Sequence, residues 1–349
     1  MPSSQEKAGI LHALSAAFLF GISIPIAKHL LGAVPAQWLA GLLYLGSGLG
    51  LAVRTWIAPK QIEAPLKKSH LVPLAAAIVF GGVLAPVLLL QGLQRTPASS
   101  ASLLLNFEAV FTGVIAWAVF GENMGTRVAL GMMSIVAGGV VLSWKGPAAI
   151  SGLYGPSAII AACFCWALDN NFTQKISGAD PVRIAMVKGL AAGTVNAAIG
   201  LTLRQPIPPL RPVTGALMLG FASYGFSLVL YVRALRALGT ARAGNYFSTA
   251  PFIGAALSVI LWREEFTPQL AASGVLMAGG LWLHFTERHQ HWHVHEAMEH
   301  EHLHVHDEHH RHEHQPDDPR GEPHSHPHRH DRQEHTHPHY PDIHHRHRH

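Results

Sequence analysis

Long apolar runs of similar length fill the first 288 residues of the chain. A bilayer core about 30 Å thick is crossed by a helix of about 20 apolar residues, because each residue adds about 1.5 Å. Backbone groups in lipid must be satisfied within their own segment, and the runs lack the alternation of barrel strands. We therefore predict ten membrane-spanning helices, approximately at residues 8–32, 35–53, 71–93, 97–120, 126–144, 153–174, 182–203, 214–236, 240–262 and 267–286.

The apolar runs also form a repeat. Four pairs of similar segments follow one another in the same order, offset by about 141 to 147 residues. They are "FGISIPIAK" at 20–28 with "WALDNNFTQK" at 166–175, "LLLQGLQRTPASSAS" at 88–102 with "LYVRALRALGTARAG" at 230–244, "FGENMGT" at 120–126 with "WREEFTP" at 262–268, and "GMMSIVAGGVVLSW" at 131–144 with "SGVLMAGGLWLHF" at 273–285.

This repeat predicts two halves of five helices each. An odd number of spans means that the second half enters the membrane from the opposite side, which gives an inverted-topology repeat. Such repeats are the framework of many secondary transporters, whose substrate site lies near the midplane between the halves. We expect an all-α polytopic membrane protein with a first five-helix repeat at residues 1–146, a second at 147–288 and a separate tail at 289–349.

Composition separates the tail from the body. Of the 27 histidines, 23 fall in residues 289–349. Residues 1–288 hold 19 Lys and Arg against 9 Asp and Glu, whereas the tail holds 6 against 12. The basic charges of the body stand in short gaps between apolar runs, so positive-inside orientation explains them better than nucleic-acid binding does. We expect no nucleic-acid partner.

The same charges predict the orientation in the membrane. The loops on the side of the N-terminus carry more Lys and Arg than the loops on the opposite side, and cytoplasmic loops are the ones enriched in these residues. An even number of spans returns the tail to the side of the N-terminus. We expect a multi-pass protein of a bacterial inner (plasma) membrane with both termini in the cytoplasm. The residues counted on the N-terminal side are Arg54, Lys60, Lys67, Lys68, Arg127, Lys175, Arg183, Arg233, Arg236 and Arg242, against Lys28, Arg95, Lys145, Arg204, Arg211 and Arg263 on the other.

The repeated motifs resemble a known family. The "FGISIPIAK" first helix, "FGE" at Glu122, "REEFTP" at Glu264 and Glu265, and the Gly-rich fifth and tenth helices are similar to EamA-type members of the drug/metabolite transporter (DMT) superfamily. The resemblance covers residues 8 to about 287. It implies a ten-helix permease working by alternating access, with both termini cytoplasmic, and says little about the substrate. One departure is Glu108, which stands where the second half has Pro251.

Ionisable residues at membrane depth are costly, so they are treated as functional candidates. Glu108 lies in the middle of the fourth span, and Asn106 adds an amide beside it. One interpretation is a proton or cation site that takes up a charge in one access state and releases it in the other. The alternative is a carboxyl group, protonated or paired with a lysine, that only holds helices together.

A second polar cluster ends the sixth span. Asp169, Asn170 and Thr173 lie in or just below the apolar run, and Asp169 and Thr173 are four residues apart, on one face of a helix. The matching part of the first helix carries Ser23 and Lys28, so the halves would present polar segments symmetrically, as central transport sites do. Alternatively, the helix ends near Leu168 and the cluster is a solvated loop.

Three further residues complete the predicted substrate or coupling-ion site. Lys188 could pair with Asp169 or Glu108, or extend to the membrane interface. Trp166 and Tyr224 could line a cavity, although aromatic residues in membrane helices also serve as packing or interface anchors.

The tail offers metal ligands. Imidazole binds zinc, nickel and cobalt, and His-x-His spacing lets a flexible chain present neighbouring rings to one ion. We predict divalent metal binding in "HLHVHDEHHRHEH", with low selectivity, and pH sensing is the rival interpretation. Few aromatic residues and many prolines predict a tail without a packed core, disordered without metal. The predicted ligands are His302, His304, His306, His309, His310, His312 and His314.

These features favour a secondary active transporter of a small solute, coupled to protons or ions, with a metal-binding cytoplasmic tail. Transport of a divalent metal, or a membrane-anchored metal store or sensor without transport, are the alternatives. No Gly-rich nucleotide-binding loop occurs, and nothing links the carboxylates to catalysis, so we expect neither an enzyme nor a required cofactor. The expected partners are the lipid bilayer, the solute and metal ions at the tail, and a homodimer is left open.

Overall fold

The computed structural model describes residues 4–57, 64–120, 125–144, 152–176, 179–238 and 240–286, and the tail segments 290–295, 298–304, 324–330 and 333–338. The described body is helical, apart from turns and loops, and forms ten rods. The rods of the first half are α1 (Ser4–Gly21) with α2 (Ser23–Leu30), α3 (Ala36–Ile57), α4 (Leu71–Ala77) with η2 (Ile78–Leu84) and α5 (Ala85–Arg95), α6 (Ala98–Leu104) with α7 (Phe107–Phe120), and α8 (Thr126–Ser143).

The second half repeats this order. Its rods are α9 (Tyr154–Gln174), α10 (Pro181–Thr202), α11 (Leu210–Gly220) with η4 (Phe221–Phe226) and α12 (Ser227–Leu238), α13 (Thr240–Phe247) with α14 (Ala250–Trp262), and α15 (Pro268–Phe285). A short helical turn, η1 (Lys68–His70), precedes α4. By length and apolar composition, seven helices of the described chain are candidate membrane spans, and Ala250–Trp262 is a shorter apolar helix. The prediction of an all-α membrane body is confirmed.

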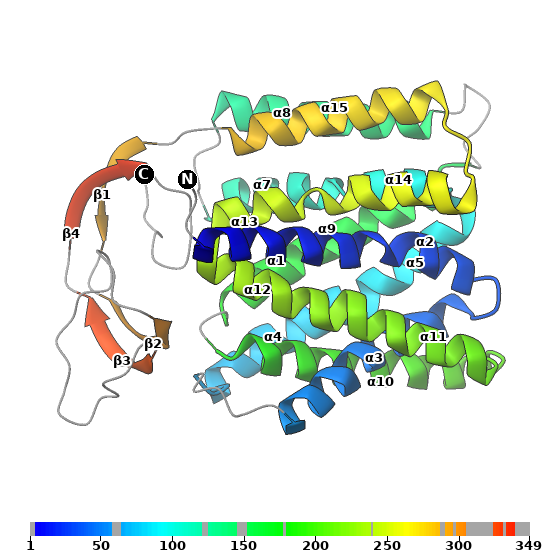
Figure 1. The fold of residues 1–349 in the computed structure, drawn as a ribbon, viewed down its shortest axis with the longest axis horizontal. Helices are drawn as coiled ribbons and strands as arrows, with labels where there is room; N and C mark the ends of the chain where they lie inside the picture. Colours follow the sequence, from blue (N-terminus) through cyan, green and yellow to red (C-terminus); the bar gives the residue numbers. More distant parts are fainter. Residues whose placement is uncertain are drawn as a thin grey trace.

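The rods lie side by side along one long axis (Figure 1). We call the end where α1 begins and α15 ends the terminal end, and the opposite end, which carries the α2–α3 and α14–α15 connections, the far end. α1 runs from the terminal end to the far end, and α9 runs the other way, because Tyr154 at its start contacts Gln91 in α5 while Ile176 just after it packs against Leu74 in α4. The equivalent first helices of the two halves are thus inverted.

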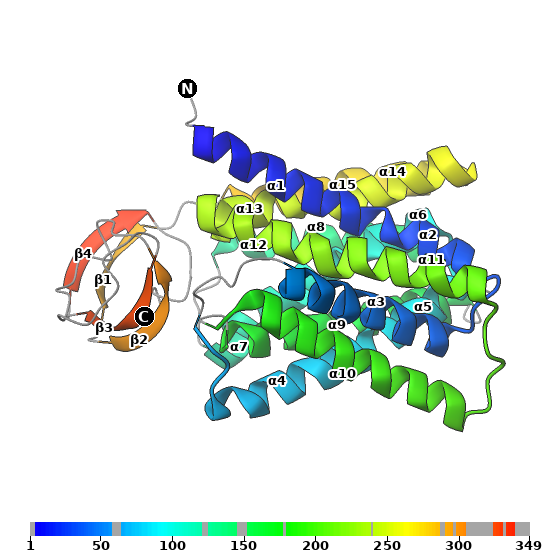
Figure 2. The same cartoon turned by 60° about the horizontal axis from the view of Figure 1, so that its bottom comes forward.

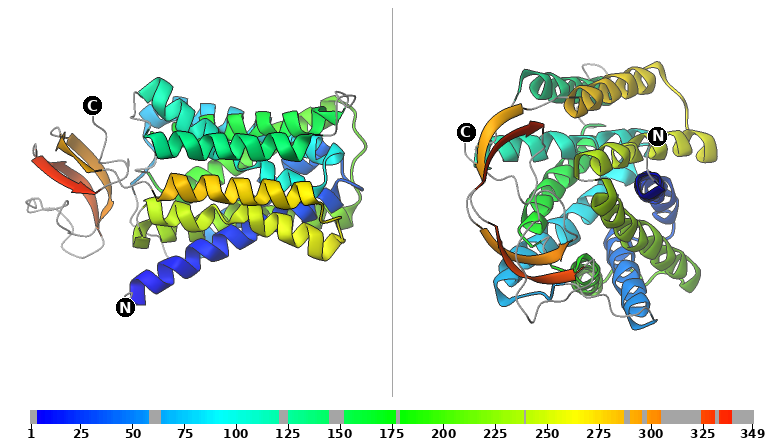
Figure 3. Two further views of the ribbon diagram at one scale, coloured as in Figure 1. Left: turned by 90° about the horizontal axis from the view of Figure 1, so that it is seen from above. Right: turned by 60° about the vertical axis from the view of Figure 1, so that its left-hand side comes forward.

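Packing between the halves follows the repeat. α3 packs on α10 and α8 on α15, and each of these pairs joins equivalent spans of the two halves (Figures 2 and 3). The contact of α1 with α12 is repeated, with the halves exchanged, in the contact of α9 with α5. Glycines bring α3 and α10 together: a Cβ at Gly48 would lie 2.6 Å from the backbone nitrogen of Leu190, and one at Gly193 would lie 2.6 Å from that of Leu45. Small residues let membrane helices approach closely enough for extensive van der Waals contact.

Three spans that the sequence predicted as continuous are broken. The span at 8–32 divides into α1 and α2 at Ile22. The span at 97–120 divides into α6 and α7 at Leu105 and Asn106, and the span at 240–262 divides into α13 and α14 at Ser248 and Thr249. In the second half Pro251 lacks the backbone N–H that would continue the hydrogen bonds of the helix. In the first half the Asn106 side chain donates to the Leu103 carbonyl at 2.8 Å, and this local bond competes with regular helix.

Two other spans contain a π-helical segment at matching places. η2 interrupts the third rod at Gly81 and Gly82, and η4 interrupts the eighth at Gly225. A π-helical turn widens the backbone and frees carbonyl groups, and such turns are frequent at functional sites. Hydropathy does not reveal these segments, because their residues are as apolar as those around them.

The structure describes two pairs of strands in the tail. β1 (Gln290–His295) pairs antiparallel with β4 (Gln333–Pro338), and β2 (Met298–His304) pairs antiparallel with β3 (His324–His330). The His-x-His pattern has the two-residue period of a strand, and a two-stranded ribbon forms hydrogen bonds without a packed core. Of the predicted metal ligands, His302 and His304 lie in β2, whereas His306, His309, His310, His312 and His314 lie outside the described residues.

Candidate transport site

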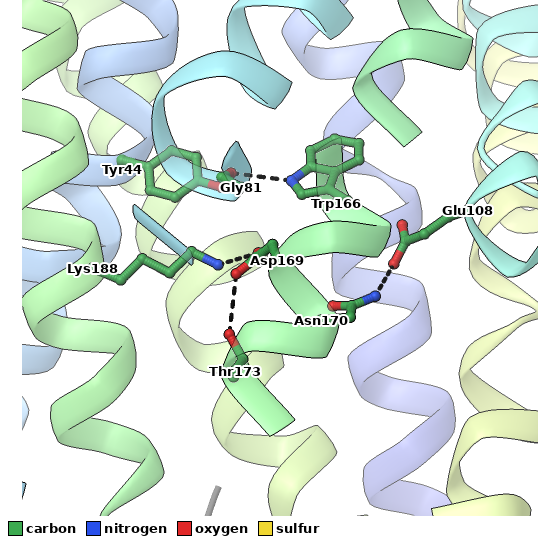
Figure 4. Close-up of polar contacts among 8 residues, drawn as sticks. All are labelled: Tyr44, Gly81, Glu108, Trp166, Asp169, Asn170, Thr173 and Lys188. Carbon is green, nitrogen blue, oxygen red and sulfur yellow. Dashed lines mark hydrogen bonds and ion pairs between the residues drawn. The ribbon is translucent and has the colours of Figure 1, made fainter. Parts of the chain in front are cut away.

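The backbone of η2 is the centre of a buried polar network (Figure 4). The carbonyl oxygen of Gly81 accepts hydrogen bonds from the Tyr44 hydroxyl of α3 at 2.5 Å and from the Trp166 indole N–H of α9 at 3.1 Å. The amide of Asn196 in α10 donates to the carbonyl oxygen of Gly82 at 3.0 Å and accepts from Gln37 in α3 at 2.8 Å. The π-helical turn therefore presents two carbonyls to side chains from both halves.

Asp169 forms the charged part of this network. Its carboxylate pairs with the Lys188 ammonium of α10 and accepts a hydrogen bond from the Thr173 hydroxyl at 3.0 Å. The Asp169 residue is only 4% exposed. Gly81 makes room for it, because a Cβ at that position would overlap the carboxylate. Of the two alternatives for Lys188, the structure has the pairing with Asp169.

The Asp169 cluster lies within a helix and not in a loop, because α9 continues to Gln174. Asp169 and Thr173 share a face of α9, as their spacing predicted. Asn170, the next residue, lies on a different side of the helix and is exposed. Its side-chain amide donates to the Glu108 carboxylate at 2.7 Å.

Glu108 lies in the first turn of α7, directly after the break in the fourth span, and not in the middle of a helix as predicted. It is partly buried. Its hydrogen-bond donor, Asn170, is neutral, and no salt bridge to Glu108 occurs among the described residues. The site thus holds one carboxylate in a salt bridge with a lysine and a second that accepts a hydrogen bond from a neutral amide.

An aromatic cluster adjoins the polar network. The ring of Tyr44 lies 5.6 Å from that of Tyr224 in η4, which lies 5.9 Å from that of Phe20 in α1. Ser23, next to the break between α1 and α2, donates to the carbonyl oxygen of Phe20 at 2.6 Å. Tyr44 therefore connects the polar network at Gly81 to Tyr224, and Phe20 connects Tyr224 to Ser23.

Two predicted site residues lie elsewhere. Lys28 lies at the far end, where its ammonium donates to carbonyls at the end of α5. Asn106 faces α15, where its amide lies 3.7 Å from the Met277 sulfur, and it caps the helix break. Lys28 lies away from Ser23 because a helix places residues five positions apart about one and a half turns apart along its axis.

The sequence missed three members of the network: Tyr44, Gln37 and Asn196. Gln37 and Asn196 are amides inside apolar spans, and that polarity was a usable signal. Tyr44 carried no comparable signal, because its hydroxyl finds its acceptor only through the widened turn at Gly81. Among the side chains that the structure describes, no group of three or more His, Cys, Asp or Glu is placed to hold a metal ion.

Ten apolar rods form two inverted halves, and polar and charged groups from both halves meet near broken and π-helical segments. These features define a polytopic membrane protein with an inverted-repeat architecture that many transporters share. The family model of the EamA-like transporter family matches the chain twice, over residues 7–144 and 153–286. The chain belongs to the EamA-like transporter family and is a multi-pass membrane transporter.

Two relatives are named as transporters. An "uncharacterized transporter" of Methanothermobacter thermautotrophicus is 28% identical over 295 residues, which cover 79% of this chain and 85% of the relative. The "uncharacterized transporter YvbV" of Bacillus subtilis is 24% identical over 279 residues, which cover 78% and 90%. A crystal structure of another protein is similar with a TM-score of 0.58 at 17% identity, over 81% of this chain and 96% of that one, and supports the fold alone.

Proposed function

We propose that this chain is a secondary transporter in which Glu108 binds the coupling proton or cation, or a cationic group of the solute, during alternating access. The observation that carries the proposal is the contrast between the two carboxylates. Asp169 forms a salt bridge with Lys188, whereas among the described side chains Glu108 accepts its hydrogen bond from the neutral amide of Asn170 and forms no salt bridge. A carboxylate without a fixed cation is free to exchange its charge partner between access states.

The surroundings of Glu108 support this assignment. The carboxylate stands at a break in one membrane helix, beside an exposed residue of α9, so it is not enclosed by the buried network. Discontinuous helices at the interface of the repeats are where secondary transporters bind substrates and coupling ions. Asp169 and Lys188 then hold α9 and α10 in position around the site.

The test is flux in reconstituted vesicles containing the full chain. We expect Glu108→Gln to abolish gradient-driven uptake of whichever solute the parent moves, because the amide isostere cannot carry the exchangeable charge. The solute panel contains amino acids, organic cations, sugars and divalent metals, so that metal transport and the storage function without transport are both outcomes. Parental uptake in Glu108→Gln would refute the proposal.

The matched control is Glu265→Gln. Glu265 is also a glutamate and is exposed in the α14–α15 connection, away from the network. Removing its charge tests whether flux responds to any lost carboxylate or to Glu108 alone. We expect parental uptake in this control.

We also propose that the tail binds divalent metal through paired histidines on the β2–β3 ribbon. The register places His300 opposite His328, His302 opposite His326, and His304 opposite His324. Residues two apart on a strand share a face, so all six positions fall on one face of the ribbon.

The ribbon makes a prediction that differs from the contiguous set of histidines expected from the sequence. Replacing His302 and His326 with alanine should weaken Zn²⁺ binding to the full chain by about tenfold or more, as measured by titration calorimetry in detergent. The matched control replaces His309 and His312, which lie outside the ribbon. Equal losses in both double variants would favour a tail that binds metal without defined pairs.

A further inference from the structure

The two halves are joined at the far end by Glu264. This residue follows α14 in the second half, and its two carboxylate oxygens accept hydrogen bonds from the backbone N–H groups of Ala98 at 2.7 Å and Ser99 at 2.8 Å. Both donors begin α6, in the first half. One carboxylate thus satisfies two amides that a helix start leaves without partners, and it does so across the boundary between the halves.

Lys28 completes this cluster from α2. Its ammonium donates to the carbonyl oxygens of Leu93, of Gln94 at 3.3 Å and of Thr96 at 3.0 Å. These groups end α5, so the cation lies at the negative end of that helix. Lys28 and Glu264 also attract each other electrostatically. The turn from α5 to α6 is therefore held at its carbonyl side by Lys28 and at its N–H side by Glu264.

Trp262 adds further contacts between the same halves. Its indole N–H donates to the carbonyl oxygen of Pro25 in α2 at 2.8 Å, and its ring stacks on that of His29 at 5.3 Å. Between Trp262 and Glu264, Arg263 has a left-handed backbone with φ of 53°. A non-glycine residue adopts this conformation at a cost, and surrounding contacts must hold it there. The contacts of Trp262 and Glu264 on either side do so.

The repeat gives Lys28 a counterpart in Lys175, because "FGISIPIAK" aligns with "WALDNNFTQK". Lys175 lies at the terminal end and is exposed, with its ammonium 5.8 Å from the centre of the Phe172 ring. In the first half the equivalent lysine caps the helix that precedes the fourth span. The helix that Lys175 would cap by the same rule is α12, which precedes the ninth span.

We propose that Glu264 and Lys28 form a gate that closes the far end in this structure, and that Lys175 caps α12 in the opposite access state. Inverted repeats exchange conformations when a transporter changes access, so a contact made by one half in one state is made by the other half in the next. In any one access state, only one of the two equivalent lysines should cap its helix. Here Lys28 is bonded to carbonyl groups, whereas Lys175 is exposed. This inference rests on the proposed transport function.

Distances between spin labels across the far end test the gate directly. The full chain carries Cys163→Ala and Cys165→Ala, with new cysteines at the exposed positions Ala33 and Phe266, one in each half. Glu264→Gln should raise the ratio of open to closed populations at least about tenfold, because the bonds lost are charge-assisted. Lys28→Met should do the same, and Lys175→Met should lower the ratio.

Glu265→Gln is the matched control, since it removes the neighbouring, exposed carboxylate. Glu264→Asp keeps the charge and provides a milder variant if Glu264→Gln does not fold, with an intermediate ratio expected. Distances in Glu264→Gln and Lys28→Met that match the control would overturn the gate. The distance measurement needs no solute. Unchanged distances in a protein with normal flux would refute the gate but not the transport function. If the far end opens in these variants but the protein transports no solute, the transport function is refuted and the gate is not.

Discussion

At the scale of single residues, Asp169 makes one contact that follows from local spacing and one, with Lys188, that depends on how two helices pack. The spacing of Asp169 and Thr173 put both on one helix face, and the structure has that contact. The lysine partner was one of several options, because it comes from α10 and nothing in the spacing fixes how two helices rotate against each other. The same limit hid Tyr44, which reaches its acceptor through a turn in a third helix.

A double-mutant cycle tests this pair. Asp169→Asn or Lys188→Met alone leaves a buried charge without its partner, and each should lower the free energy of unfolding by about 3 kcal/mol or more. The double variant leaves no unpaired charge and should be more stable than either single variant. Thermal unfolding in detergent measures all three. Losses that simply add in the double variant would show that the two groups act independently.

At the scale of elements, the positions of the spans were predictable and their interruptions were not. Apolar length identifies a membrane helix, but the breaks after Leu104 and Phe247 and the π-helical turns at Gly81 and Phe221 leave the composition unchanged. Pro251 was a local signal for the break in the second half. The first half has Glu108 at that position, so its break depends on the Asn106 side chain and on packing around it.

Contacts between elements give a matched pair of substitutions on α15. A Cβ at Gly280 would lie 2.5 Å from the Gly131 carbonyl oxygen of α8, whereas one at Gly279 would meet nothing within 4 Å. Gly280→Val should therefore separate α8 from α15 and lower the melting temperature, at a cost of about 1–3 kcal/mol. Gly279→Val, next to it on the same helix, should have little effect. Equal shifts in the two melting temperatures would contradict this packing.

At the scale of the whole molecule, the repeat predicted more than hydropathy did. It indicated two inverted halves. In the structure α3 packs on α10 and α8 on α15, so equivalent helices of the two halves lie against each other. The side of the membrane that each end faces is a prediction from loop charge alone. The tail ribbon was not predicted, because composition indicates the lack of a packed core but does not specify backbone pairing.

Labelling with a membrane-impermeant thiol reagent tests the orientation. In a background with Cys163→Ala and Cys165→Ala, cysteines at Ala33 and Phe266 at the far end should react in intact cells. A cysteine at Ser69, which lies at the terminal end, should react only after permeabilisation, because the basic loops of that end are expected in the cytoplasm. The reverse pattern would place both termini outside.

The sequence by itself determined the membrane-spanning class, the number and order of the helices, the internal repeat and most of the residues that could carry charge into the membrane. These follow from transfer of apolar segments into lipid and from local spacing, which need no knowledge of distant contacts. Only the tertiary structure decided which charges meet, where helices break, and that Glu264 joins the halves at the far end, where Lys28 holds the end of α5. Those features depend on how helices rotate and approach, and close packing across the interface sets that geometry.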